Sequence, residues 1–200
     1  MNRKEKSLIN KEIRNLKIIE RRKEKKEIVD KKWILIILLL SFTISFSLSF
    51  ISETTLPNIN IVPGIIIVIL FILLGILFDM IGVAVTVADE KIFHSMNSRK
   101  VKGADVAVLF KKNSDKVASF CNDVIGDIAG VITGAAGITI SIKLSQVLNI
   151  NVFIITLITT AIIASFTISG KALGKSYAIN KSDLILFKFS KFISNFYKIK

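Results

Sequence analysis

Four long apolar segments alternate with polar segments along this chain. The apolar segments are Trp33 to Ile51, Ile61 to Ala88, Ala118 to Ile142 and Ile150 to Ile168. Each holds about the 20 residues that an α-helix needs to cross roughly 30 Å of hydrocarbon. Lipid offers the backbone no hydrogen-bonding partner, so each segment is expected to be helical. The pattern therefore predicts an all-α polytopic membrane protein with four transmembrane helices.

The polar segments predict further helices. Residues 1–32 place apolar residues at helical spacing among charges, which predicts a basic helical tail that is either solvated or docked on a surface. Residues 89–116 predict a short helical hairpin near the membrane surface. Residues 177–200 alternate phenylalanines and isoleucines with lysines, which predicts an amphipathic juxtamembrane helix in the inner-leaflet interface, with a soluble packing helix as the alternative.

Glycines mark the second and third apolar segments. The second is long and contains Gly75 and Gly82, so we expect it to be broken or tilted, or to continue into a cytoplasmic helix. In the third, glycines recur every four residues at Gly126, Gly130 and Gly134. Small residues at this spacing predict a face that another helix can approach closely. The pattern leaves open whether that helix belongs to the same chain or to a second one.

Charge follows the same division of the chain. The protein has 200 residues, is 52% hydrophobic and carries a formal net charge of +13. All but one of its 28 lysines and arginines lie in residues 1–32, 89–116 and 170–200, and the exception is Lys143. The positive-inside rule then predicts a multi-pass protein of the cell membrane with both termini cytoplasmic. Since the charge tracks topology, we do not expect a nucleic-acid partner.

Few residues offer chemistry of other kinds. The lone cysteine, Cys121, cannot form an intramolecular disulfide and is expected to pack as a small apolar residue. The lone histidine, His94, has no His or Cys at metal-ligand spacing and is expected to be solvated. The chain contains no Walker loop, nucleophile elbow, His-Glu-x-x-His or Rossmann motif. We therefore do not expect an enzyme.

Three acids lie in or beside the apolar segments: Asp79, Asp123 and Asp127. An ionised carboxylate inside the membrane is costly unless it meets a cation or water. Carboxylates together with hydroxyls and carbonyls form the oxygen-only ligand set that suits Mg²⁺. The alternative is that Asp123 caps a helix at the interface while Asp79 lies in a wet crevice.

Residues 64–197 resemble the transmembrane domain of the CNNM/CorC magnesium-transporter family, also written CorB/CorC or cyclin M. The segments that carry the resemblance are Asp79 to Ala84 followed by Thr86, then Gly103-Ala104, Ile125-Gly126-Asp127, Gly130 to Ala135 and Gly170 to Lys175. The last of these corresponds to the family's exit motif, through Gly170, Lys171 and Lys175. The resemblance implies a three-span domain over residues 61–176, with residues 33–51 as an extra transmembrane helix and 177–200 as the juxtamembrane helix.

The chain also departs from that family. Gly82 stands where the family has an acid, Lys171 replaces a glutamate, Gly174 replaces a proline, and the CBS domains that often follow are absent from this chain. The resemblance implies a homodimer that transports or binds a divalent cation, with Asp79, Thr86, Asp127 and Asp123 near Mg²⁺. The departures favour the alternative, a membrane scaffold or regulatory subunit that kept the fold and lost the ion site.

Overall fold

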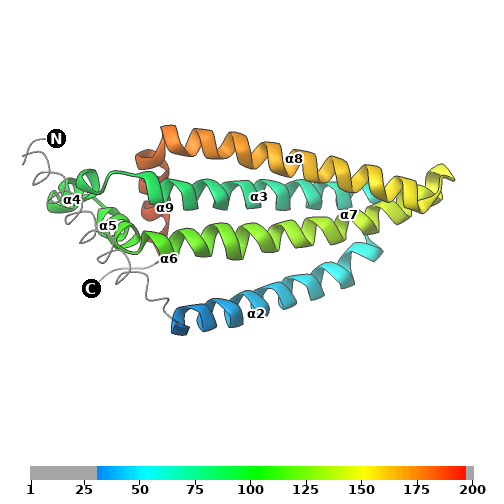
Figure 1. Cartoon of the computed structure of the whole chain (residues 1–200), viewed down its shortest axis with the longest axis horizontal. Coiled ribbons are helices and arrows are strands. Elements are labelled where there is room, and N and C mark those ends of the chain that lie inside the picture. The colour runs from blue at the N-terminus through cyan, green and yellow to red at the C-terminus, as the bar shows by residue number, and fades with distance from the viewer. Residues whose placement is uncertain (1–30, 197–200) are drawn as a thin grey trace, which may run out of the picture. The chain divides into compact units, whose positions relative to one another are not determined.

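The computed structural model describes residues 31–196, which form helices and no strand (Figure 1). In chain order the elements are α2 (Lys31–Thr55), η1 (Leu56–Asn58), α3 (Ile61–Val87), α4 (Glu90–Ser98), α5 (Ala104–Lys112), α6 (Ser114–Ser119), η2 (Phe120–Gly126), α7 (Asp127–Leu148), α8 (Val152–Asn180) and α9 (Ser182–Ile193). Within the described residues, four stretches are long and apolar enough to cross a membrane: α2, α3, the continuous α6–η2–α7 and α8. The predicted all-α polytopic fold is confirmed.

The chain divides into two compact units, residues 1–39 and residues 40–200. The described part of the first unit is the beginning of α2, where Leu35 and Leu38 are exposed. The predicted basic tail helix lies outside the described residues. In the second unit, the hydroxyls of Ser47 and Thr54 donate to carbonyl oxygens one turn earlier in α2, at 2.8 and 2.9 Å. These polar groups are therefore satisfied within their own helix.

Glycines of α3 lie at the helix contacts of the bundle that α3, α7 and α8 form. A Cβ on Gly64 would lie 3.3 Å from the Ile140 side chain, and one on Gly75 would lie 3.4 Å from the Cβ of Ala129. Of the alternatives for this segment, a break is wrong, because α3 is continuous from Ile61 to Val87. The glycines leave the helix uninterrupted. Their lack of a side chain lets α7 approach closely.

The α8 helix is longer than its apolar segment. It continues from Ile168 to Asn180, so Gly170, Lys171 and Lys175 lie inside the helix and do not mark its end. Gly174 is buried, and a Cβ there would lie 2.9 Å from the Met80 side chain of α3. The two glycines of the predicted exit motif thus pack against α3, while Lys175 is exposed. The following helix begins at Ser182 rather than at residue 177.

The short helices gather at one end of the bundle, which we call the basic end. The helices α4 and α5 pack together, confirming the predicted hairpin, and α9 packs against α3 and α5. Phe93 of α4 and Leu186 of α9 are fully buried in a cluster with Val85, Ala88 and Ala107. The basic end therefore has an apolar core of its own, continuous with the end of α3.

Candidate polar site at the junction of three helices

The ionisable residues that the sequence singled out lie at similar depth in their helices. At 1.5 Å per residue, Asp79 lies about 27 Å from the start of α3, and Lys171 lies about 28 Å from the start of α8. Asp127 lies about 31 Å from the end of α7. These distances match the roughly 30 Å thickness of the hydrocarbon layer. All three residues therefore belong to one layer near the basic end.

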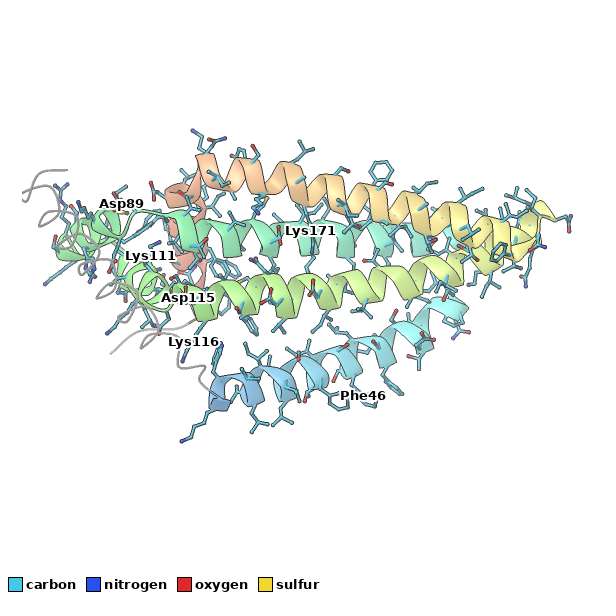
Figure 2. The ribbon with its side chains drawn as sticks, viewed as in Figure 1. Phe46, Asp89, Lys111, Asp115, Lys116 and Lys171 are labelled. Carbon is cyan, nitrogen blue, oxygen red and sulfur yellow. The ribbon has the colours of Figure 1, made fainter. Side chains whose placement is uncertain are left out.

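Lys171 reaches into the junction between α8, α3 and η2. The point that a Cβ on Gly126 would occupy lies 3.7 Å from the Nζ atom of Lys171. The same point lies 3.5 Å from the carbonyl oxygen of Cys121 and 4.0 Å from that of Gly75. Lys171 is partly buried, and Figure 2 shows it where α8 runs beside α3. The absence of a side chain at Gly126 thus leaves room for the ammonium group of Lys171 at this junction.

The turn that precedes Gly126 is a π-helix over residues 120–126. Within it, the amide of Asn122 lies directly against Gly82 of α3, where a Cβ would lie 2.6 Å from the Asn122 Cγ. The buried Oδ1 of Asn122 finds no hydrogen-bond partner among the described residues. Single-turn π segments are rare and often occur at functional sites. The widened turn therefore presents an unsatisfied acceptor to α3.

The predicted metal ligands do not come together at this junction. Asp123, Asp127 and Thr86 are exposed, and the Thr86 hydroxyl donates to the carbonyl oxygen of Val83 at 2.8 Å. Asp79 is partly buried on α3, between the row that faces η2 and the row that faces α8. Across residues 31–196 there is no group of three or more His, Cys, Asp or Glu side chains that could hold a metal ion.

Hydroxyl groups in the bundle are occupied by their own helices. Thr133 and Ser141 are buried, and their hydroxyls donate to the carbonyl oxygens of Ala129 and Gly137 at 2.6 and 2.7 Å. Thr167 of α8 donates to the carbonyl oxygen of Ile163 at 2.8 Å. Such bonds remove the hydroxyl donors from the pool that could bind water. The donated hydrogens are therefore paired within the helices, while the hydroxyl oxygens keep their lone pairs.

The three predicted packing glycines of α7 have different surroundings. Gly126 lies within the helix junction described above, whereas a Cβ on Gly130 or Gly134 would meet no atom within 4 Å. Both face a groove of about 280 Å³ between α7 and α8, lined by Gly130, Thr133, Gly134, Thr160, Ile163, Ala164, Thr167 and Ile168. The groove ends one helical turn before Lys171. Close packing within the chain thus involves Gly126 but leaves the other two glycines open.

Comparison with models of known protein families, with curated proteins and with solved structures found no match. The resemblance to the CNNM/CorC domain therefore rests on the sequence motifs given above. What the fold establishes is a multi-pass, all-α membrane protein whose spans are packed through glycines.

Two other lysines bind backbone carbonyls at opposite ends of the bundle. Lys111 of α5 donates to the carbonyl oxygens of Val85 and Thr86 at 3.1 and 2.7 Å, capping the end of α3. Lys143 of α7 donates to those of Leu56 at 3.2 Å and of Ile59, beside η1. The isolated lysine of the sequence is therefore a structural one. Sequence reasoning offered no partner for either residue, because both contacts join segments far apart in the chain.

The remaining single residues have ordinary surroundings. Cys121 is buried with 2% of its surface exposed, which confirms that it packs as a small apolar residue. His94 is exposed, and its Nε2 atom lies 3.2 Å from a carboxylate oxygen of Glu90 one turn earlier. Both agree with what the sequence predicts. Sequence reasoning missed the role of Asn122 and the inward position of Lys171. The signal available for Asn122 was a polar residue opposite a glycine of α3.

Proposed function

We propose that this chain is a non-transporting membrane scaffold or regulatory subunit, and that the ammonium of Lys171 stands where a mobile cation would otherwise bind. The position of the Lys171 Nζ atom at the helix junction, 3.7 Å from the point that a Cβ on Gly126 would occupy, carries this proposal. At an effective dielectric constant of 20, a fixed unit charge 4 Å from a divalent ion opposes binding by about 8 kcal/mol. A divalent cation is therefore strongly disfavoured at this junction.

Other features support the same conclusion. Asp123 and Asp127, expected to be ligands, are exposed, and Gly82 stands where the CNNM/CorC motif has an acid. A scaffold needs surfaces for partners rather than a path for an ion, and the groove beside Gly130 offers one.

In this proposal the basic end faces the cytoplasm, so both termini are cytoplasmic, as the distribution of lysines and arginines predicts. The partner at the groove between α7 and α8 is a second copy of the chain, because Gly130 and Gly134 leave room for a helix to approach. Disulfide crosslinking of a Gly134→Cys, Cys121→Ala variant in membranes tests this arrangement. A homodimer gives a crosslinked band, and its absence at every protein density removes the homodimer.

Ion flux tests the proposal itself. The purified protein is reconstituted in liposomes that contain a Mg²⁺-sensitive dye, together with Lys171→Met and a matched Lys175→Met variant, whose lysine is exposed on the same helix. We expect no flux from the unmodified protein beyond that of empty liposomes, and no rise of its melting temperature in millimolar Mg²⁺. Flux that Asp127→Ala abolishes would overturn the proposal.

Divalent-cation transport is the second candidate, and the unpaired Oδ1 of Asn122 favours it. That oxygen lies in the π turn next to α3, in the same layer as Asp79. Transport predicts that Mg²⁺ stabilises the folded protein and that Asn122→Leu removes this stabilisation. The scaffold predicts no Mg²⁺ effect in either protein, so a single thermal series separates the two functions.

A further inference from the structure

The length of α8 sets the depth of the helix that follows it. With 29 residues, α8 is about 43 Å long, which equals the thickness of a bilayer including both headgroup layers. Only Lys181 separates α8 from α9, and Figure 1 shows α9 turning away from the direction of α8 at the basic end. Tyr177, an exposed aromatic residue of the kind enriched at membrane interfaces, precedes this turn. When α8 spans the membrane, α9 therefore begins in the headgroup layer.

Contacts on one side of α9 define which face it buries. Leu186 and Ser190 are fully buried, one turn apart. Asp183 accepts a hydrogen bond at 2.9 Å from the backbone N–H of Asp89, at the start of α4. Gly103, which has no side chain, lets the backbone of Lys191 approach closely. The rotation of α9 about its axis is thus determined by three separate contacts with α4, α5 and the bundle.

The opposite face of α9 combines aromatic and basic side chains. Phe192 and Phe196 are 58% and 78% exposed, and their rings contact each other at a centroid distance of 5.3 Å. Lys188 is exposed on the same side, which lies about 100° or more from the buried row, and Lys191 is exposed at its edge, where its backbone meets Gly103. The one acid of α9, Asp183, is bound to α4 and does not offset these charges.

We propose that this outward face of α9 binds anionic phospholipid headgroups of the leaflet at the basic end. At headgroup depth, the rings of Phe192 and Phe196 enter the boundary of the acyl chains, while the ammonium groups of Lys188 and Lys191 contact lipid phosphates. In-plane helices bind in this way, through apolar burial together with attraction to anionic lipid. Lys181, exposed at the start of α9, adds a third cation. The proposal is independent of the scaffold function and of which side the leaflet faces.

The depth of the face is measured with a tryptophan probe. Phe192→Trp is introduced into the full chain together with Trp33→Phe, so that the protein carries a single indole. In bilayers of brominated lipids, we expect the strongest quenching from bromines near the headgroup end of the acyl chain, and weak quenching by aqueous iodide. Efficient iodide quenching without quenching by brominated lipids would overturn the proposal, because the face would then be in water or against a soluble partner.

The choice of lipid is measured by competition between spin-labelled phosphatidylglycerol and phosphatidylcholine in nanodiscs. A basic residue near the surface contributes about fivefold to anionic-lipid association, so Lys188→Gln with Lys191→Gln should reduce the preference by about fivefold for each lysine. The matched control is Lys100→Gln with Lys102→Gln, which removes two exposed lysines from the turn between α4 and α5. An equal preference in the unmodified protein and both double variants would overturn the proposal, even if every variant keeps its melting temperature.

Discussion

Gly103 joins α4 to α5 with a backbone φ of +88°, in the left-handed region that a side chain disfavours. A Cβ at this position would lie 2.7 Å from the Cα of Lys191 and 3.0 Å from its backbone nitrogen. Because the neighbour is helix backbone, it can yield only if α9 moves. Gly103→Ala therefore perturbs both the turn and the docking of α9.

The expected cost has two parts. A left-handed residue with a Cβ costs about 1–2 kcal/mol, and overpacking against a fixed neighbour costs about 1–3 kcal/mol. Together they destabilise the folded protein by about 2–5 kcal/mol. For a chain of this size, each kcal/mol lowers the melting temperature by roughly 2–4 °C. A loss of about 3 kcal/mol thus lowers it by about 6–12 °C.

Thermal unfolding in detergent, followed by circular dichroism, measures this change, and limited trypsin digestion reports whether Lys188 and Lys191 become accessible first. The matched control is Gly130→Ala, where the added Cβ would meet no atom within 4 Å and alanine is a better helix former by about 1 kcal/mol. A melting temperature for Gly103→Ala equal to that of the unmodified protein would refute the reasoning. So would an equal loss in Gly130→Ala.

Two further substitutions test single contacts. Lys111→Met removes the hydrogen bonds that the Lys111 ammonium donates to the carbonyl oxygens of Val85 and Thr86. Because hydrogen bonds to charged groups contribute about 1.5–3 kcal/mol each, this variant should have a lower melting temperature. The control Lys112→Met, at an exposed neighbour, should keep the melting temperature of the unmodified protein. Asn122→Leu removes a buried acceptor without a hydrogen-bond partner, which costs about 1–3 kcal/mol. Under the scaffold proposal this variant should therefore have a higher melting temperature. A lower melting temperature would show that Asn122 has a partner.

Hydropathy predicts the number and type of the spans because the lipid imposes the same requirement on every segment. The end of α8 could not be predicted in this way. Gly170 and Lys171 resemble the polar exit of a span, yet the helix continues because its backbone satisfies itself and because α3 packs against Gly170 and Gly174. Similarly, Gly75 and Gly82 suggest a break, but they are the surface on which α7 and η2 pack.

The sequence predicts how deep each residue of the candidate site lies along its helix, but not which way its side chain faces. The positions of Asp79, Asp127 and Lys171 along their helices follow from counting residues. Which of them faces the junction depends on the rotation of each helix, and this is determined by close contacts such as that between Asn122 and Gly82. The acid at Asp127 therefore looks central in the sequence and is exposed in the structure, whereas Lys171 looks peripheral and is directed inward.

The π turn at Phe120–Gly126 has a consequence for how the third span tolerates insertions and deletions. Such a turn accommodates one residue more than an α turn. Removing one residue there would restore regular α-helix, and because the π turn already absorbs that residue, α6 and α7 would keep nearly the same facing. The third span therefore tolerates the loss of one residue at this turn, whereas the same deletion inside α7 would rotate the two parts of the span by about 100° and change which side chains face lipid.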